Sequence, residues 1–305
     1  MPRRTPSKHR SRQRSMTAAS GGGQRLQKFI ATAGIDSRRK CESYIREGRV
    51  TVNSQTVTDP AHTVDPATDI VLMDGERLHL PKPKYYLLNK PKGVLCTNRD
   101  PSGRPRAIDL VPGDADRLFT VGRLDEHTEG LLLLTNDGNL AEHMAHPRYE
   151  VVREYRAQVA GVPTQETLTE LRKGMHFSDG IFRFREVRFL KRRGHSAFLE
   201  IQLREGKNRE VRRMLARCGH KVIQLQRVAF GPLRIGRLKP GQCRELRSAE
   251  VRELHDFVSG RPNERSTNRN PNRNANSRHQ GGPRKTGKAT STKRGSVRHR
   301  SHPKD

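Results

Sequence analysis

The chain lacks several features that mark common protein classes. It contains no tryptophan, five tyrosines and nine phenylalanines in 305 residues, so few aromatic faces are available to stack on a ligand. Its four cysteines are scattered without short paired spacings, which argues against a zinc ribbon or a disulfide framework and is typical of a reducing compartment.

Long apolar segments and nucleotide-binding motifs are also absent. The longest purely apolar stretch, Leu131–Leu134, is far too short to span a bilayer, and no apolar region follows the basic N-terminus as in a secretory signal. We find no G-x-G-x-x-G, G-x-x-x-x-G-K-[ST] or H-E-x-x-H motif, which argues against common nucleotide-driven enzymes and metallohydrolases. We therefore expect a soluble cytoplasmic protein.

Acidic residues are scarce. Lys and Arg number 61 against 32 for Asp and Glu, which gives a formal charge of +29 and favours a polyanionic partner. Residues 1–23 and 259–305 are basic, rich in small polar residues and almost free of large apolar ones, so both are predicted to be disordered. Charge alone does not separate DNA from RNA, or an enzyme from a structural binding protein.

The remaining chain divides into two predicted folded domains, 24–82 and 84–258, joined by the stiff connector Pro81–Lys84. In the first, helical spacing ends at Gly34, a second helix begins after Ser37, and short strands follow. In the second, interspersed helices and strands without a regular βαβ repeat predict an α+β fold on a mainly antiparallel mixed sheet.

We expect the strands of the second domain at Tyr85–Leu88, Phe119–Leu124, Leu131–Thr135, Arg153–Val159, Ala197–Leu203 and Val222–Arg227. Its expected helices are Leu140–Ala145, Gln165–Lys173, Asn208–Cys218 and Ala249–Val258.

Residues 25–53 closely resemble the RNA-binding domain first seen in ribosomal protein S4, and the resemblance extends over about 24–72. In that family the second helix and the following turn contact structured RNA. Spacing alone is equally compatible with a solvated helix face. The resemblance implies RNA contacts for a set of polar residues: Lys28, Arg38, Arg39, Lys40, Arg46, Arg49 and Asn53.

The strongest signal for a catalytic site is F-T-V-G-R-L-D-E-H-T-E-G-L-L-L-L-T-N-D-G at 119–138. Apolar segments flank a polar loop that carries Arg123, Asp125, His127 and Glu129. A solvated acidic turn is the usual explanation of such a loop, and we interpret His127 as a surface residue. The pair Asp125 and Glu129 also permits glycosidase chemistry, although loop spacing fixes no separation between two carboxylates.

The same segment resembles the signature of bacterial ribosomal RNA pseudouridine synthases, in the family of the small-subunit enzyme. L-N-K-P-K-G at 88–93, H-P-R-Y-E-V-V-R-E-Y-R-A-Q-V at 146–159 and L-R-E-G-K-N-R-E-V-R-R-M-L at 203–215 extend the likeness over most of the chain. The last motif and the basic C-terminal tail look more like the large-subunit members, which favours 23S over 16S rRNA as the substrate.

The resemblance implies a role for each of four residues. Asp125 is the catalytic carboxylate, as a nucleophile at the anomeric carbon or in an elimination that leaves a glycal. Arg212 keeps that carboxylate charged, Tyr155 stacks on the detached uracil, and Arg123 holds the RNA from which the base is flipped. The turn at Lys90–Gly93 and the loop 99–106 are either RNA-contacting segments or ordinary surface loops. We expect a monomer, and the alternative is a non-catalytic rRNA-binding or ribosome-assembly factor.

Overall fold

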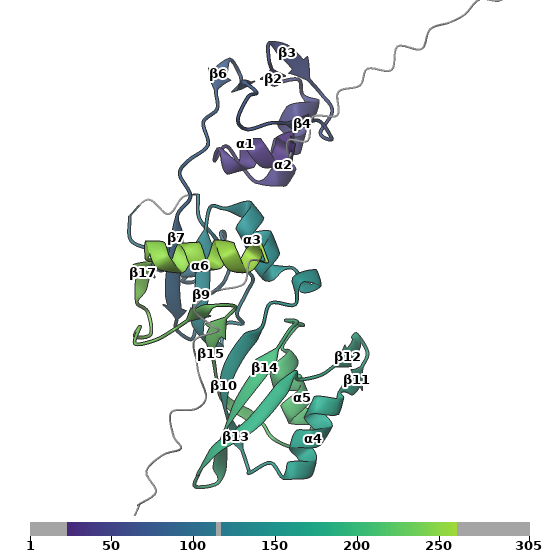
Figure 1. Cartoon of the computed structure of the whole chain (residues 1–305), viewed down its shortest axis with the longest axis vertical. Helices are drawn as coiled ribbons and strands as arrows, with labels where there is room; N and C mark the ends of the chain where they lie inside the picture. The colour runs from purple at the N-terminus through teal and green to yellow at the C-terminus, as the bar shows by residue number, and fades with distance from the viewer. Residues whose placement is uncertain (1–22, 114–116, 261–305) are drawn as a thin grey trace, which may run out of the picture. The chain divides into compact units, whose positions relative to one another are not determined.

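The computed structural model describes residues 23–113 and 117–260 (Figure 1). The two tails predicted to be disordered lie outside these residues, apart from Gly23, Ser259 and Gly260. Within the described ranges the longest helix has 11 residues, and none has the length and apolar character required to cross a bilayer.

The N-terminal region follows the order expected from the sequence, two helices and then short strands. Leu26, Phe29, Ile30, Cys41 and Ile45 of the helices pack on valines of the strands in one buried core. Ser37 caps the second helix, because its Oγ accepts a hydrogen bond from Lys40 N at 3.4 Å. The elements are β1 Gln24–Arg25, α1 Leu26–Thr32, α2 Arg38–Arg46, β2 Val50–Val52, β3 Gln55–Val57, β4 Thr63–Val64, β5 Val71–Met73 and β6 Glu76–Arg77.

The rest of the described chain is built on one nine-stranded sheet. Seven strands follow the order β13-β14-β10-β15-β9-β7-β17, β8 pairs with β9, and β16 pairs with β15. The strands are β7 Tyr85–Lys90, β8 Phe119–Thr120, β9 Glu129–Thr135, β10 Arg153–Ala160, β13 Glu186–Arg193, β14 Ser196–Leu203, β15 Val222–Phe230, β16 Leu233–Arg234 and β17 Cys243–Glu245. Among the described strand pairs of this sheet only β15 with β9 is parallel. The predicted α+β class and mainly antiparallel sheet are confirmed.

Helices cover both faces of this sheet. Leu140 and Met144 of α3 and Leu254 of α6 pack on alternate residues of β7 and β9. Leu168 of α4 and Met214 of α5 pack on β10 and β14 in a second core. The described helical segments are η1 Ala107–Leu110, α3 Gly138–Ala145, η2 Pro147–Tyr149, α4 Gln165–Lys173, α5 Glu210–Arg217 and α6 Ser248–Val258, and β11 Met175–Phe177 forms a hairpin with β12 Gly180–Phe182.

One predicted strand was too long. Phe119–Leu124 was expected to be extended throughout, but β8 ends at Thr120 and the chain turns at Gly122, whose φ is +69°. The residues before Asp125 therefore belong to a loop. Strands β11, β12, β13, β16 and β17 were not predicted, because they are short or carry mostly charged side chains.

Candidate active site

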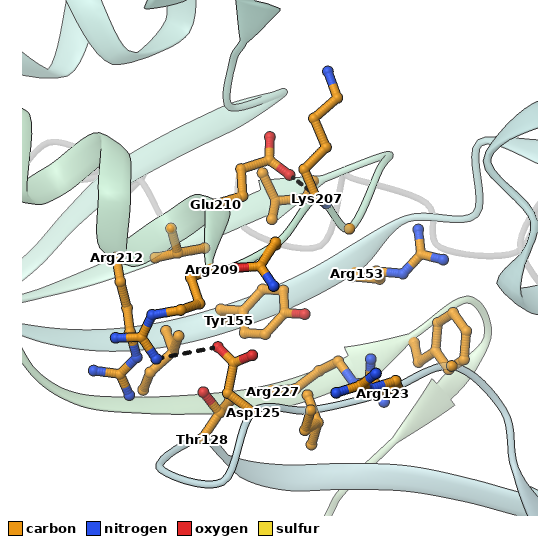
Figure 2. Close-up of a pocket in the computed structure, with 18 of the residues that line it drawn as sticks. Arg123, Asp125, Thr128, Arg153, Tyr155, Lys207, Arg209, Glu210, Arg212 and Arg227 are labelled. Atoms are coloured by element: carbon orange, nitrogen blue, oxygen red, sulfur yellow. Dashed lines mark hydrogen bonds and ion pairs between the residues drawn. The ribbon is translucent and has the colours of Figure 1, made fainter. Parts of the chain in front are cut away.

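A cavity of about 340 Å³ opens between the 122–128 loop, β10, β15 and the start of α5. Asp125, Tyr155 and Arg212, the three predicted catalytic residues, all line it, although 87 positions separate the first from the last. Figure 2 shows the Asp125 carboxylate beside the Tyr155 ring, with a dashed line to the guanidinium group of Arg209 on its left. Arg123 lines the same cavity and is exposed to solvent. The structure thus brings together the four catalytic-domain residues that the sequence singled out.

The loop that carries Asp125 is fixed by bonds to its backbone. Thr128 N donates to Asp125 O at 3.0 Å, and Gly93 N donates to Glu126 O at 3.0 Å. Arg212 Nη2 donates to His127 O at 2.8 Å. The exposed position of His127 agrees with its interpretation as a surface residue. Since these bonds come from the turn after β7, from α5 and from the loop itself, Asp125 occupies a defined place at the cavity wall.

Lys90 also holds this loop. Its ammonium group is fully buried and donates to Pro91 O at 2.9 Å, Val94 O at 2.8 Å and Glu126 O at 3.3 Å. Burial lowers the pKa of this lysine, because the charged form loses its hydration. The turn at Lys90–Gly93 was predicted to be an RNA-contacting segment or a surface loop, but the Lys90 side chain is buried and contacts backbone carbonyls instead.

The basic residue nearest to the Asp125 carboxylate is Arg209. Its Nη1 lies 3.9 Å from Asp125 Oδ2, and the two side chains are 48% and 35% exposed. A pair with this exposure stabilises the fold by at most about 1 kcal/mol. Arg209 has a φ of +49°, in the left-handed region, directly before α5 begins. Its side chain therefore extends over the acid from the end of a helix.

Arg212 contacts the backbone of the loop that carries Asp125. In addition to His127 O, its guanidinium contacts Val222 O at 3.4 Å, so it ties the catalytic loop to β15. Burial lowers the pKa of Arg212, the nearby Arg209 lowers it further, and the negative charge of Asp125 opposes both. The charge of Asp125 therefore affects the pKa of Arg212, whereas the ion pair of Asp125 is formed with Arg209.

The floor of the cavity comes from β10 and β15. Tyr155 pairs with Arg227, and a shift of register between Glu154 and Tyr155 bends the strand there. Arg227 is 2% exposed; its Nε donates to Leu131 O at 2.8 Å, while Nη2 is buried without a hydrogen-bond partner. Gly130 faces it with a φ of +111°, and a Cβ there would lie 2.3 Å from Arg227 O. Only glycine allows β9 and β15 to approach this closely.

Two more charged residues are buried at the cavity. Arg153 donates through Nη1 to Val151 O at 3.0 Å and Arg204 O at 2.8 Å, and its guanidinium lies over the Phe230 ring at 5.1 Å. Burial lowers the pKa of Arg153 and raises that of Glu210, whose carboxylate accepts a bond from Lys207 N at 3.1 Å. These bonds close the 204–210 turn that precedes α5.

Most of the predicted RNA-binding residues of the N-terminal domain are exposed, as a binding surface requires. Arg38, Arg39 and Lys40 are exposed on α2. Lys28 is partly buried on α1, and Arg46, which is exposed, lies 3.5 Å from Glu42.

Arg49 and Asn53, the remaining two predicted RNA-binding residues, have partners inside the domain. Arg49 pairs with Asp74 at 2.6 Å and lies over the Tyr44 ring at 4.5 Å. Asn53 accepts from Ile70 N and donates to Asp69, each at 3.0 Å, so its amide shapes a turn. RNA binding by this set remains a prediction.

Sequence reasoning did not single out Arg209, Lys90 and Arg227 as site residues. Arg209 lies in the same basic motif as Arg212, which was chosen from the resemblance. A left-handed backbone at a residue other than glycine has no sequence signal. Lys90 and Arg227 were not expected to be buried, because lysine and arginine side chains are rarely buried completely. Across 23–113 and 117–260, no three His, Cys, Asp or Glu side chains are grouped so that they could hold a metal ion.

Comparison with known proteins identifies the class of site. The RNA pseudouridylate synthase family model matches residues 84–217, and the S4 domain model matches residues 24–71. A crystal structure of a pseudouridylate synthase superposes with a TM-score of 0.54 at 26% identity, covering 75% of this chain and 99% of the other.

Two curated relatives match this chain over nearly the whole of their own length. An uncharacterized RNA pseudouridine synthase of Aquifex aeolicus is 42% identical over 235 residues, which is 77% of this chain and 94% of the relative. The ribosomal large subunit pseudouridine synthase B of Bacillus subtilis is 39% identical over 233 residues, 76% of this chain and 95% of the relative. The chain belongs to the RNA pseudouridine synthase family and carries an S4 domain, and the predictions of an enzyme and of both families are confirmed.

Proposed function

We propose that the protein converts a uridine of 23S rRNA to pseudouridine, with Asp125 as the catalytic carboxylate and without a cofactor. The observation that supports this most directly is the single cavity that holds Asp125, Tyr155, Arg209 and Arg212. Its volume of about 340 Å³ lies within the range of small-molecule sites. A cavity of this size suits a single flipped nucleotide better than double-helical nucleic acid. The name of the Bacillus subtilis relative favours the large ribosomal subunit.

The reaction is an isomerisation, so its atoms balance within the substrate. The bond between ribose C1′ and uracil N1 breaks, a bond between C1′ and C5 forms, the C5 proton leaves, and N1 gains a proton. A carboxylate at the sugar is required, either to attack C1′ or to assist an elimination. Asp125 suits this role because its carboxylate lies at the cavity wall, with the guanidinium group of Arg209 at 3.9 Å.

Three other residues complete the proposal. Tyr155, 7% exposed at the cavity floor, stacks on the detached uracil and keeps it in the cavity while it turns. Arg212 positions the catalytic loop through His127 O. Arg123, exposed at the cavity edge, contacts the RNA strand that has lost its stacked base. The protein acts as a monomer in the cytoplasm, and its S4 domain binds rRNA.

The test is tritium release from 23S rRNA labelled at uracil C5, with labelled 16S rRNA in parallel. We expect release from 23S rRNA with the wild-type protein and background release with Asp125→Asn, which still binds the RNA and unfolds at the same temperature. The side chain is 35% exposed and has one weak ion pair, so the substitution leaves the fold intact. Turnover by Asp125→Asn would refute the catalytic assignment. RNA binding without release by the wild type would favour a non-catalytic rRNA-binding or assembly factor.

A further inference from the structure

A basic patch lies at the end of the large sheet, away from the cavity. Lys191, Arg192 and Arg193 at the end of β13, and His195 in the turn that leads to β14, are all exposed. The connection from α5 to β15 adds Lys221, which is exposed, and the partly buried His220. These turns lie at the lower end of the sheet in Figure 1. We refer to these six residues as the distal basic patch.

Hydrogen bonds hold the segments of the patch together. Gly161 N, at the end of β10, donates to His195 O at 2.8 Å, and Ala160 N donates to Lys221 O at 2.9 Å. His220 Nδ1 lies 2.9 Å from Ala160 O. Residues 158–163, 188–195 and 219–222 contain no Asp or Glu, so cations from separate parts of the chain meet without an acid in these segments to balance them.

Protection of a sheet edge does not account for this arrangement. Charged side chains on an edge strand prevent pairing with other chains, and β13 is such a strand. His220 and Lys221, however, lie on the α5–β15 connection and not on that edge. Phe189 and Leu190 of β13 are 43% and 42% exposed, which works against such protection. A surface that concentrates cations beside exposed apolar groups fits nucleic acid better.

The register of the sheet places the patch at a useful distance from the cavity. Tyr155 and Ala160 are five residues apart on β10, and Ala160 pairs with Ser196 beside the turn. At about 3.3 Å per residue the patch begins about 17 Å from the Tyr155 level. About five nucleotide steps of a helical strand, at roughly 3.4 Å each, cover this distance. When a uridine of the RNA lies in the cavity, phosphates about five nucleotides away can therefore contact the patch.

We infer that the distal basic patch binds the phosphodiester backbone of the substrate RNA outside the reacting nucleotide. This inference rests on the proposed function, because it takes the RNA to be held at the Asp125 cavity. Phosphate contacts of this kind set the register of a protein on its nucleic acid, while the base is recognised elsewhere. The distal basic patch thus gives the catalytic domain an RNA-binding surface of its own, in addition to the S4 domain.

The test compares two triple variants that remove the same charge. Lys191→Gln, Arg192→Gln and Arg193→Gln change the patch. Arg237→Gln, Lys239→Gln and Arg252→Gln change exposed cations on the β16–β17 connection and on α6, towards the other edge of the sheet. Binding to transcribed 23S rRNA is measured from 50 to 300 mM KCl, with tritium release and thermal unfolding alongside.

We expect the patch variant to bind more weakly, with a raised KM for RNA and a plot of log K against log salt that is shallower by about two to three. Addition of Lys221→Gln should flatten the plot further. The control variant should match the wild type in slope and turnover. Equal slopes for both triple variants, with an active wild type, would overturn the inference and leave the proposed function standing. A wild type that neither binds nor releases tritium would overturn both.

Discussion

Replacement of Lys90 by methionine tests whether a buried ammonium group holds the catalytic loop. Methionine keeps most of the volume but removes the charge and all three hydrogen bonds. The carbonyls of Pro91 and Val94 lose these bonds, at about 1–3 kcal/mol each, while Glu126 O still accepts from Gly93 N. Removal of a buried charge offsets part of this loss. We therefore expect the free energy of unfolding at neutral pH to fall by about 2–4 kcal/mol.

The same substitution should affect catalysis more than RNA binding. Glu126 directly follows Asp125, so release of its carbonyl from Lys90 loosens the backbone that places the acid. A displacement of about 1 Å at a catalytic group can lower the rate about 100-fold. Single-turnover tritium release measures this effect, and urea unfolding measures the stability. Lys92→Met is the matched control, because Lys92 is exposed and has only a 3.5 Å ion pair with Glu129.

The pH dependence of stability gives an independent check. Burial lowers the pKa of Lys90, so the native state releases this proton at a lower pH than the unfolded chain does. Between the native and the unfolded pKa the unfolded chain binds more protons, and the free energy of unfolding rises with pH. Lys90→Met should lack this contribution, so its deficit relative to wild type should grow as the solution becomes alkaline. A variant as stable and as active as Lys92→Met would refute the reasoning.

Three further substitutions test the site, and Gly236→Ala serves as a control. Gly130→Ala should lower the free energy of unfolding by about 3–5 kcal/mol, because its Cβ would lie 2.3 Å from Arg227 O at a φ of +111°. In the same urea titration Gly236→Ala, with open space around the new methyl group, should lower the free energy of unfolding by about 1 kcal/mol. Arg209→Gln should slow tritium release with a stability change within about 0.5 kcal/mol. Arg212→Gln should also lower stability by about 1–3 kcal/mol, since the carbonyls of His127 and Val222 lose a donor. Equal stability losses for Arg209→Gln and Arg212→Gln would contradict this division of roles.

Much of the fold was predictable because its periodicities are strong. The helix Gln165–Lys173 agrees with α4 at both ends, and Ser37 was recognised as a cap because its side chain makes a local hydrogen bond. The β13 strand escaped prediction since it lies at an edge and exposes six of its eight residues, so no apolar alternation marks it. Edge strands of this kind take their conformation from the neighbouring strand.

The motif was sufficient to single out Asp125, which lines the cavity, whereas the residues that hold its loop could not be predicted. Lys90 follows a hydrophobic strand and precedes a proline, and nothing in that order shows that its ammonium group turns inward to three carbonyls. Arg227 ends a run that looks like any strand, yet it lies where β10, β15 and β9 meet at Gly130. Such contacts join residues far apart in the chain, so local periodicity contains no information about them.

Arg209 and Arg212 show why spacing in a motif does not assign roles. Both guanidinium groups of this pair approach the loop that carries Asp125 from the N-terminal end of α5. Arg209 precedes the helix in a left-handed conformation and reaches the carboxylate, while Arg212 sits one turn further and reaches the backbone at His127. A lysine at 212 would keep the charge but would lose the planar fork that contacts both His127 O and Val222 O. Arg212→Lys should therefore resemble Arg212→Gln in urea unfolding, and a stability equal to wild type would show that charge alone is required there.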